Sequence, residues 1–371
     1  MKVLITGANG FVGKNLVWEL RNQGFADADL LLYDIDTDPA LLDEYTKSAE
    51  FVFHLAGVNR PKDDTEFMAG NFGFTTTLLD ALIKNNNKAP VLITSSIHAA
   101  GDTPYGISKR AGEDAIFAYG KAQGVKVLVY RLQNLFGKWC RPNYNSAVST
   151  FCYNIAHGLD ITVNDRATVV PLVYIDDLLA EFMRALSGKE TRQGEFCVVE
   201  TYYAESLGDI ADLLYGFKAS RQTLDVPNVG DAFAKKLYST YLSYLEPDDF
   251  TYPLNTHEDP RGFFAEAFKS AASGQVSVNV SRPGVTKGNH WHHTKIEKFL
   301  VVSGEGVIRF RKIDSDEITE CQVSDRMLMV VDVPPGYTHS IVNTGTENMV
   351  TIIWASEIFD PGRPDTYYLE V

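Results

Sequence analysis

Three histidines and one glutamate stand at spacings typical of a metal site in the last part of the chain. His290, His292 and Glu297 fall in a short run rich in strand-forming residues, and His339 follows the next proline- and glycine-rich turn. Imidazole and carboxylate are donors that divalent first-row metals take from proteins. Because residues i and i+2 of a strand point to one face, His290 and His292 would face a common cavity. Chance would have to place three of the chain's eight histidines at these spacings, so the pattern predicts a divalent metal site.

The donor set also indicates which metal to expect. Cys321 is the one cysteine in this part of the chain and lies outside the histidine-rich segments, which excludes a thiolate site. Neutral imidazoles with a single carboxylate suit zinc with an open position for a substrate oxygen better than a closed structural site. We therefore expect zinc, with iron, nickel and manganese as alternatives because imidazole binds them as well.

The start of the chain has a pattern typical of nucleotide binding. Residues 2–13 read K-V-L-I-T-G-A-N-G-F-V-G, an apolar strand that runs into a glycine-rich turn and an amphipathic helix. Gly7, Gly10 and Gly13 would let the backbone approach a pyrophosphate, which then sits on the helix N-terminus. Other tight strand-to-helix turns use glycines too, but this one opens a βαβ unit. The pattern predicts a dinucleotide site.

The next strand, L-L-L-Y-D at 30–34, ends in a carboxylate. Asp34 would bond a ribose 2′-hydroxyl and repel a 2′-phosphate. No arginine or lysine follows before Lys47, so these residues by themselves favour NADH.

Tyr105 and Lys109 stand four residues apart at the start of a helical stretch and therefore share one face. A phenol titrates near pH ~10, and a neighbouring ammonium favours its phenolate, which brings it within reach of acid–base work near neutrality. An ordinary surface pair is the alternative. Beside a dinucleotide site, we expect Tyr105 to act as a proton donor.

The elements that must position these residues fall into two parts. Strand and helix patterns alternate up to about residue 190, which predicts a doubly wound parallel sheet, and helical pieces up to about 243 would form a substrate lobe. Residues 246–262 combine three prolines with five acidic residues, and short strands between Gly, Pro and Asn turns follow. We therefore expect a first domain at 1–245, a linker at 246–256 and a β-barrel at 257–371. The strands expected in the first domain lie near 2–6, 29–34, 51–56, 90–95 and 126–132.

Composition is consistent with two cores in a cytoplasmic enzyme. A chain of 371 residues with 45% hydrophobic content is long enough for two cores. No apolar run has the length of a membrane span and no leader opens the chain, so we expect no membrane insertion. Four cysteines without a CxxC pattern suggest reduced thiols in a cytoplasm. The net charge of −14 disfavours nucleic-acid binding.

The first part resembles the extended short-chain dehydrogenases/reductases. The motifs that carry this resemblance are T-G-A-N-G-F-V-G at 6–13, H-L-A-G at 54–57, N-F-G-F-T-T-T at 71–77, T-S-S at 94–96 and Y-G-I-S-K at 105–109. Two further stretches resemble the sugar-nucleotide branch, R-L-Q-N-L-F-G at 131–137 and V-Y-I-D-D-L at 173–178.

This resemblance implies roles for individual residues. Tyr105 would be the catalytic acid, Lys109 its partner and Ser96 (or Ser95) the second hydrogen-bond donor, although the eight residues between Ser96 and Tyr105 are fewer than is usual. Asn134 and Arg166 would bind the sugar nucleotide, with a solvated loop arginine as the alternative for Arg166. The residues implied to bind the cofactor are Gly7, Asn9, Gly10, Phe11, Gly13, Asp34, Leu55, Ala56, Gly57, Asn71 and Lys109.

The second part resembles the cupins, double-sheet barrels of the jelly-roll type. Gly284 to Gly304 match every fixed position of their first motif, G-x5-H-x-H-x4-E-x6-G. The second motif, G-x5-P-x-G-x2-H-x3-N, is matched except that Leu328 replaces its opening glycine. By this resemblance the metal ligands are His290, His292, Glu297 and His339.

Two further segments resemble the deoxysugar-nucleotide 3,5-epimerases, which are cupin-like barrels without a metal. These segments are D-P-R-G-F-F-A-E-A-F at 259–268 and N-V-S-R-P-G-V-T-K-G-N-H at 279–290. The resemblance implies substrate binding by Arg261 and Lys287, and in those enzymes the histidine that matches His290 is the catalytic base. His290 is therefore a ligand or a base, and the other three ligand residues favour the ligand.

Taken together, the chain resembles the bifunctional enzymes of UDP-N-acetyl-L-fucosamine synthesis in bacterial capsule and O-antigen pathways. The resemblance implies that the barrel epimerises C3 of UDP-2-acetamido-2,6-dideoxy-β-L-arabino-hexos-4-ulose. The first domain would then reduce C4 with NADPH to UDP-2-acetamido-2,6-dideoxy-β-L-talose, in a homodimer. Lys287, His293 and Tyr337 are candidates for the general base.

Other classes of function remain open at this point. A reductase with a structural or dimerising barrel would reduce C4 without exchanging the C3 hydrogen. A redox sensor usually lacks an intact Y-x-x-x-K, which this chain retains. An iron-dependent oxygenase has no second cofactor signature to support it.

Overall fold

The computed structural model describes residues 1–371 and divides them into two compact units. The first unit comprises Met1–Tyr215 and Val229–Leu245, and the second comprises Gly216–Asn228 and Glu246–Val371. Helix α8 (Leu207–Thr223) contributes to both units. Residues 216–228, which the sequence pattern places in the first domain, thus group with the barrel.

The first unit is built on a seven-stranded sheet in the order β2-β1-β3-β4-β5-β9-β8. All its neighbouring strands pair in parallel except β8 and β9. Strands β1 and β3 are buried along their whole length, which explains their continuous apolar sequences. The strands are β1 Val3–Thr6, β2 Leu30–Tyr33, β3 Phe51–His54, β4 Val91–Ser96, β5 Val127–Leu132, β8 Arg192–Gln193 and β9 Phe196–Cys197.

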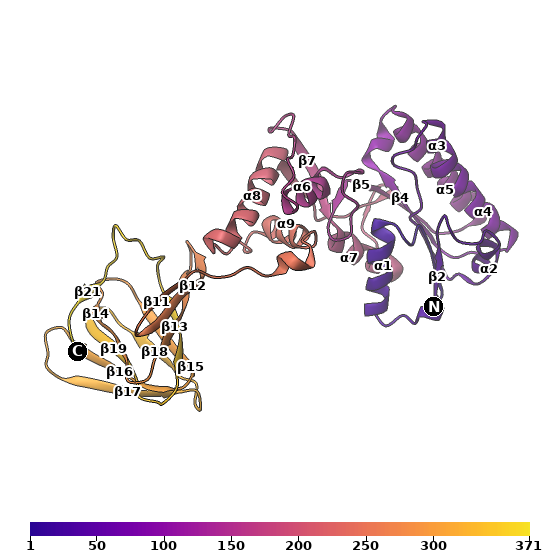
Figure 1. Ribbon diagram of the computed structural model, residues 1–371. Helices are drawn as coiled ribbons and strands as arrows, with labels where there is room; N and C mark the ends of the chain where they lie inside the picture. The colour runs from indigo at the N-terminus through magenta and orange to yellow at the C-terminus, as the bar shows by residue number, and fades with distance from the viewer. The chain divides into compact units, whose positions relative to one another are not determined.

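Helices cover both faces of this sheet (Figure 1). Helices α2, α4 and α5 pack side by side on one face, and α1 packs with α7 on the other. Right-handed crossovers between parallel strands produce this division. The carboxyl ends of β1, β3 and β4 consequently meet at one edge, where α1 and α5 begin. The helices are α1 Phe11–Asn22, α2 Ala40–Ser48, α4 Phe74–Lys84, α5 Pro104–Gln123 and α7 Ile175–Leu186.

A three-stranded sheet, β10-β7-β6, and two helices, α6 and α9, complete the first unit. The strands are β6 Asn134–Phe136, β7 Val169–Tyr174 and β10 Tyr203–Ser206, and the helices are α6 Ala147–Ala156 and α9 Ala232–Leu242. Short helical segments lie at α3 Thr65–Phe67, η1 Asp27–Asp29, η2 Met68–Gly73 (a π-helix), η3 Ile97–Ala100 and, in the second unit, η4 Pro247–Phe250.

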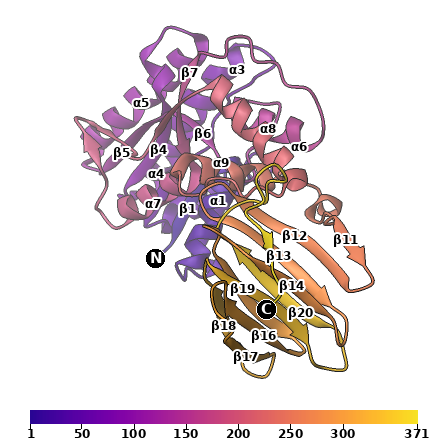
Figure 2. The same ribbon diagram turned by 90° about the vertical axis from the view of Figure 1, so that its left-hand side faces the viewer.

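The second unit is a pair of antiparallel sheets in the orders β11-β12-β13-β20-β15-β18 and β17-β16-β19-β14-β21 (Figure 2). Both sheets contribute to one apolar core, for example Phe299 and Met349 from the first and Ile308 and Ile341 from the second, so their inner faces pack together. The strands are β11 Thr256–Asp259, β12 Gly262–Ser270, β13 Gly274–Ser281, β14 Thr286–Trp291, β15 Glu297–Ser303, β16 Glu305–Lys312, β17 Ile318–Ser324, β18 Val330–Val333, β19 Tyr337–Asn343, β20 Met349–Ala355 and β21 Tyr367–Tyr368.

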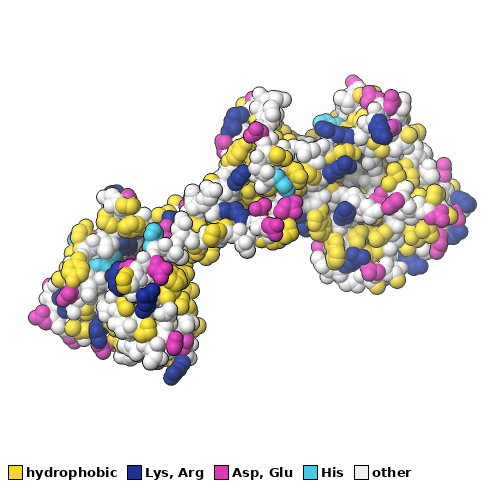
Figure 3. Space-filling model, in the orientation of Figure 1, with side chains coloured by type: hydrophobic (Ala, Val, Ile, Leu, Met, Phe, Trp, Pro, Cys, Tyr) yellow, Lys and Arg dark blue, Asp and Glu magenta, His cyan; other side chains and the backbone are white.

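The predicted fold class is confirmed: a Rossmann-type parallel sheet with helices on both faces is followed by an all-β antiparallel region. None of the helices combines the length and apolarity needed to span a bilayer. On the face shown in Figure 3, acidic and basic side chains are interspersed over each unit.

Candidate functional sites

The turn after β1 has the close backbone approaches of a dinucleotide site. Gly7 has φ +72°, and a Cβ there would lie 2.7 Å from the Ala56 amide nitrogen. A Cβ at Gly13 would lie 2.2 Å from the Gly7 carbonyl oxygen. Helix α1 begins directly after this turn, and no side chain caps its N-terminus. Its first amides can therefore hold a pyrophosphate, and these residues fit the predicted cofactor.

Asp34 is held at the end of β2 by two backbone amides. Its Oδ2 accepts from the Asn9 amide at 2.7 Å and its Oδ1 accepts from the Ile35 amide at 2.8 Å. The next cation along the chain, Lys47, pairs with Asp43 at 2.7 Å. No cation therefore approaches Asp34 from this segment.

A pocket of about 890 Å³ opens beside the nucleotide turn. It lies where the carboxyl ends of β1, β3 and β4 meet, the place where open parallel sheets bind ligands. Among the predicted site residues, its lining includes Gly7, Asn9, Gly10, Phe11, Gly13, Leu55, Gly57, Ser96, Tyr105, Lys109 and Asn134.

Tyr105 lies in the first turn of α5, which begins with a capped turn. The Thr103 hydroxyl accepts from the Gly106 amide at 3.1 Å, and Pro104 occupies the first helical position. Lys109, one turn later, lies 5.9 Å from the centre of the Tyr105 ring and donates to the Thr94 carbonyl at 3.3 Å. The geometry thus brings the predicted acid and its partner together in the pocket.

Of the two candidate serines, Ser96 rather than Ser95 interacts with Tyr105. Ser96 hydrogen-bonds the Tyr105 side chain. Ser95 is buried and donates to Glu113 Oε1 at 2.5 Å, so its hydroxyl is directed away from Tyr105.

The expected effect of Lys109 on Tyr105 is not found. Burial raises the pKa of Tyr105, and the hydrogen bond from Ser96 opposes this rise without cancelling it. Burial also lowers the pKa of Lys109 to about 8, against the opposing charge of Glu113. The expectation that the pKa of the phenol falls towards neutrality is therefore wrong here, because burial of the phenol dominates. The phenol stays protonated at neutral pH, as an acid requires.

Glu113 is a buried residue behind the pair that sequence reasoning missed. Its carboxylate, in a side chain 2% exposed, accepts from Arg131 Nε at 2.9 Å and Nη2 at 2.6 Å. With the bond from Ser95, this network joins β4, α5 and β5. A glutamate four residues beyond Lys109 was the available signal.

Asp34 and three further predicted residues, Ala56, Asn71 and Arg166, are absent from the lining of the pocket. Asn71 is buried and bonds both backbone groups of Val58 and the Ser108 hydroxyl, so it anchors a loop. Ala56 lies against Gly7 through its backbone. Arg166 does not line the pocket. Its side chain is exposed and pairs with that of Asp212, also exposed, at 2.7 Å.

Arg141 is the arginine that lines the pocket, and sequence reasoning missed it. It is exposed, and its guanidinium lies 5.0 Å from the ring centre of Tyr144, which also lines the pocket. A planar guanidinium beside an aromatic ring suits a phosphate group.

In the second unit, the four predicted metal ligands come together. His290 pairs in register with His339 across β14 and β19, and a bulge in β14 precedes it. Glu297 Oε2 lies 3.4 Å from His292 Nε2 and 3.3 Å from His339 Nε2. One donor atom from each of the four residues lies within 4.8 Å of the others.

Several donor atoms of this cluster have no partner within the protein, which suits the cluster to a cation. His292 Nε2 and both ring nitrogens of His339 are buried without a hydrogen-bond partner, which is rare for buried polar atoms. Burial would raise the pKa of Glu297, but the adjacent His292 and His339 side chains outweigh this effect and hold the pKa well below its usual range. Burial lowers the pKa of His290 to about 4. Neutral imidazole and ionised carboxylate are the forms that bind a metal.

Arg261 and Lys287 both have protein partners. Two nitrogens of Arg261 donate to Asp259 Oδ2, Nε at 3.0 Å and Nη2 at 2.7 Å. Lys287 Nζ donates to Asn279 Oδ1 at 2.8 Å and to the Val280 carbonyl at 2.9 Å. Burial lowers the pKa of Lys287, which favours its use as a base.

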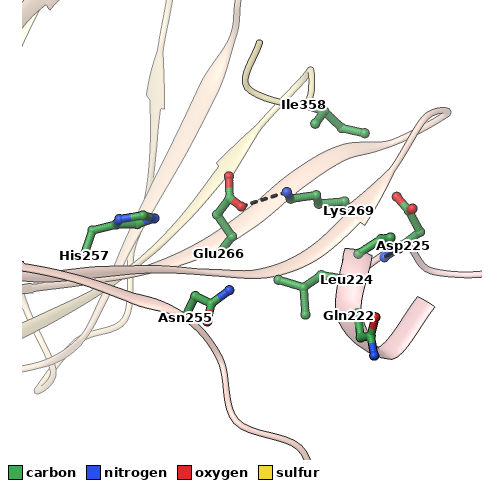
Figure 4. A pocket seen from close by; sticks show the side chains of 9 residues that line it. Gln222, Leu224, Asp225, Asn255, His257, Glu266, Lys269 and Ile358 are labelled. Carbon is green, nitrogen blue, oxygen red and sulfur yellow. Dashed lines mark hydrogen bonds and ion pairs between the residues drawn. The ribbon is translucent and has the colours of Figure 1, made fainter. Parts of the chain in front are cut away.

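A second pocket, of about 550 Å³, lies within the second unit (Figure 4). Glu266 and Lys269, both on β12, form an ion pair at 2.7 Å in this pocket. The end of α8 and strand β11 also contribute residues to its lining. None of the predicted site residues lines this pocket.

Comparison with known proteins now places the chain. Residues 3–199 match the profile of the NAD dependent epimerase/dehydratase family, and residues 257–367 match the polysaccharide biosynthesis C-terminal domain. The chain belongs to the NAD dependent epimerase/dehydratase family. As a member of this family, it uses a nicotinamide cofactor, and the nucleotide turn of the first unit supplies the matching site.

Two known proteins are similar to this chain over both of its parts. It is 44% identical over 371 residues to the UDP-2-acetamido-2,6-beta-L-arabino-hexul-4-ose reductase of Pseudomonas aeruginosa, covering 100% of this chain and 99% of the relative. The crystal structure of the capsular polysaccharide assembling protein CapF from Staphylococcus aureus matches with a TM-score of 0.95 and 51% identity, over 100% of both chains. A UDP-glucose 4-epimerase from Thermotoga maritima, at 19% identity and a TM-score of 0.55, covers 66% of this chain and 98% of its own length and shares the fold of that part.

Proposed function

We propose that this protein is a bifunctional sugar-nucleotide enzyme of capsule or O-antigen precursor synthesis. The second unit epimerises C3 of UDP-2-acetamido-2,6-dideoxy-β-L-arabino-hexos-4-ulose, and the first unit then reduces C4 to give UDP-2-acetamido-2,6-dideoxy-β-L-talose. The observation that carries the reductase assignment is the convergence of Tyr105, Lys109 and Ser96 beside the nucleotide turn. The 44% identical relative, named as a reductase of a 4-keto sugar nucleotide, supports the substrate class.

In the reductase step, three side chains act on the C4 carbonyl. The bound nicotinamide supplies the hydride that is added to C4. Ser96 donates a hydrogen bond to the C4 oxygen, and Tyr105 gives that oxygen its proton as negative charge develops on it. The Lys109 ammonium, 5.9 Å from the ring centre, stabilises the phenolate that remains. Residues 1–245 would carry this activity.

We propose NADPH as the cofactor, which the family resemblance implies. Asp34 would ordinarily disfavour a 2′-phosphate, but its two carboxylate oxygens already accept backbone amides of Asn9 and Ile35. Those amides offset part of the negative charge that the phosphate would meet.

In the epimerase step, the ketone at C4 acidifies the hydrogen at C3, so that a base can remove it and a proton can return on the opposite face. His290, His292, Glu297 and His339 would hold a divalent metal, with zinc expected first, which would supply Lewis-acid stabilisation of the developing negative charge. Lys287 is our first candidate for the base, because burial lowers its pKa and Asn279 and Val280 fix its position. Residues 257–371 would carry this activity, and a homodimer is the expected assembly.

The test of the proposal is a product analysis with NADPH deuterated at the transferable position. One deuterium at C4 of a talo-configured product, together with stoichiometric NADPH consumption, is the expected result. A product reduced at C4 but with the C3 configuration of the substrate would leave the reductase and exclude the epimerase. The barrel would then be structural or dimerising, which is the alternative reading of the second unit.

A further inference from the structure

The C-terminal segment 364–371 runs along β14, the strand that carries His290 and leads into His292. Strand β21 pairs with β14, placing Tyr368 opposite His290 and Tyr367 opposite Trp291. The Leu369 amide then donates to the Asn289 carbonyl at 3.0 Å. The end of the chain is therefore built into the wall of the histidine cluster.

Asp365 fixes the turn that connects His292 with Glu297. Its carboxylate accepts from three successive backbone amides, those of His293 at 3.0 Å, Thr294 at 2.9 Å and Lys295 at 2.8 Å. Three amide donors on one carboxylate define the path of this short turn. The distance between the two ligand candidates that flank it depends on that path.

The main chain of Asp365 acts on His292 itself. The Asp365 carbonyl accepts from His292 Nδ1 at 2.6 Å. A carbonyl can only accept, so Nδ1 carries the hydrogen and Nε2 keeps its lone pair. That Nε2 is the buried, unpartnered nitrogen 3.4 Å from Glu297 Oε2. Asp365 thus selects the tautomer and ring orientation that a metal needs.

Lys295 also holds the two residues that flank Asp365. Its side chain is 6% exposed, and its ammonium donates to the Pro364 carbonyl and the Thr366 hydroxyl, both at 2.8 Å. Asp365 itself has φ +37°, a backbone region that few residues other than glycine adopt. Local preference alone would not select this conformation, so the contacts of Asp365 and its neighbours maintain it.

We infer that Asp365 is a positioning residue of the metal centre and that segment 364–371 is a structural part of that centre. The inference rests on the proposed metal site and extends it to a residue far away in sequence. Partners that orient a metal-binding histidine typically contribute about 10–100-fold to metal affinity.

Variants at Asp365 can separate its carboxylate from its backbone. Asp365→Gly removes the carboxylate and tolerates the positive φ without strain, whereas Asp365→Asn keeps one acceptor oxygen and also tolerates that conformation. Asp360→Ala is the matched control, because Asp360 is a carboxylate in the same tail that only accepts the local Gly362 amide.

The experiment measures Zn²⁺ affinity of the stripped full-length protein by competition with a chromophoric chelator, and the absorption spectrum of the Co²⁺-loaded protein. We expect Asp365→Gly to bind Zn²⁺ about 10–100-fold more weakly than wild type with an altered Co²⁺ spectrum. Asp365→Asn should fall in between, and Asp360→Ala should match wild type. NADPH binding by the first unit serves as the folding control.

The outcomes distinguish this inference from the proposed function. Wild-type affinity and spectrum in both Asp365 variants would overturn the positioning role of the Asp365 carboxylate while leaving the metal site intact. A wild-type protein that binds no divalent metal would overturn the metal site and the positioning role together. If Asp365→Gly does not fold, Asp365→Asn decides: unchanged affinity there overturns the inference, and weakened affinity supports it.

Discussion

Replacing Glu113 with glutamine should move the basic limb of the reductase pH profile to lower pH. Glu113 is 2% exposed, accepts two hydrogen bonds from Arg131, and opposes the fall in the pKa of Lys109 that burial causes. Burial and the Lys109 charge together lower the pKa of His54 to about 3, so His54 adds no charge in the working range. Glu113 is therefore the acidic group that keeps Lys109 protonated.

The size of the shift follows from the spacing of the two residues on α5. Residues four apart on a helix are neighbours, and at an effective dielectric of about 20 and a charge separation of about 7 Å their attraction is roughly 2 kcal/mol. Arg131, in its bidentate pair with Glu113, offsets part of this attraction. We expect the pKa of Lys109 to fall below about 8 by about one unit, or ~1.4 kcal/mol.

The assay measures kcat/KM for NADPH from about pH 6 to about pH 10, a range that brackets the titration of Lys109. This ratio is chosen because it reports ionisations of the free enzyme. The protonated Lys109 stabilises the phenolate, so activity should be lost as pH rises through its pKa, and earlier in Glu113→Gln. Asp114→Asn is the control, since Asp114 is an exposed carboxylate on the same helix. A basic limb that stays at its wild-type pH in a folded Glu113→Gln protein would refute the role of Glu113.

Four further outcomes are expected. Tyr105→Phe should lower NADPH oxidation by about 10²–10⁴-fold while NADPH binding, followed by fluorescence, changes little; turnover within a few-fold of wild type would remove Tyr105 from the mechanism. Arg141→Ala should raise the KM for the sugar nucleotide by roughly tenfold through loss of a charge-assisted hydrogen bond, and Arg166→Ala should leave it unchanged; the reverse pattern would restore the phosphate role to Arg166. His339→Ala should lose the metal, measured by elemental analysis, and keep NADPH binding; retained metal would contradict the ligand set. Wild-type protein should bind NADPH more tightly than NADH, and a clear preference for NADH would show that Asp34 repels the 2′-phosphate.

The sequence indicated the first pocket well because its signals are local. The glycine turn and the Tyr105–Lys109 spacing each lie within one stretch of chain, and the parallel sheet necessarily brings strand ends to one edge. The sign of the pKa change at Tyr105 could not be predicted, because it depends on how deeply the phenol and the ammonium are buried. The pairing of Arg166 with Asp212 could not be predicted for a similar reason, because the two residues are remote in sequence.

In the second unit, the histidine spacing predicted which residues gather, because His290 lies on β14, His292 follows directly after that strand, and the register of β14 with β19 supplies His339. The role of Asp365 had no such signal. It depends on the tail pairing with β14 and on a positive φ at a residue that is not glycine. The grouping of residues 216–228 with the barrel was equally hidden, because helix α8 continues without a break across the division.

The most direct test of the bifunctional assignment is C3 hydrogen exchange in deuterated water with the 4-keto sugar nucleotide and no nicotinamide cofactor. The account predicts that the wild-type protein incorporates deuterium at C3 without reducing C4, that Tyr105→Phe does so at the same rate, and that His339→Ala does not. Exchange absent from wild-type protein that still reduces the sugar with NADPH would contradict it and leave the barrel without a catalytic role.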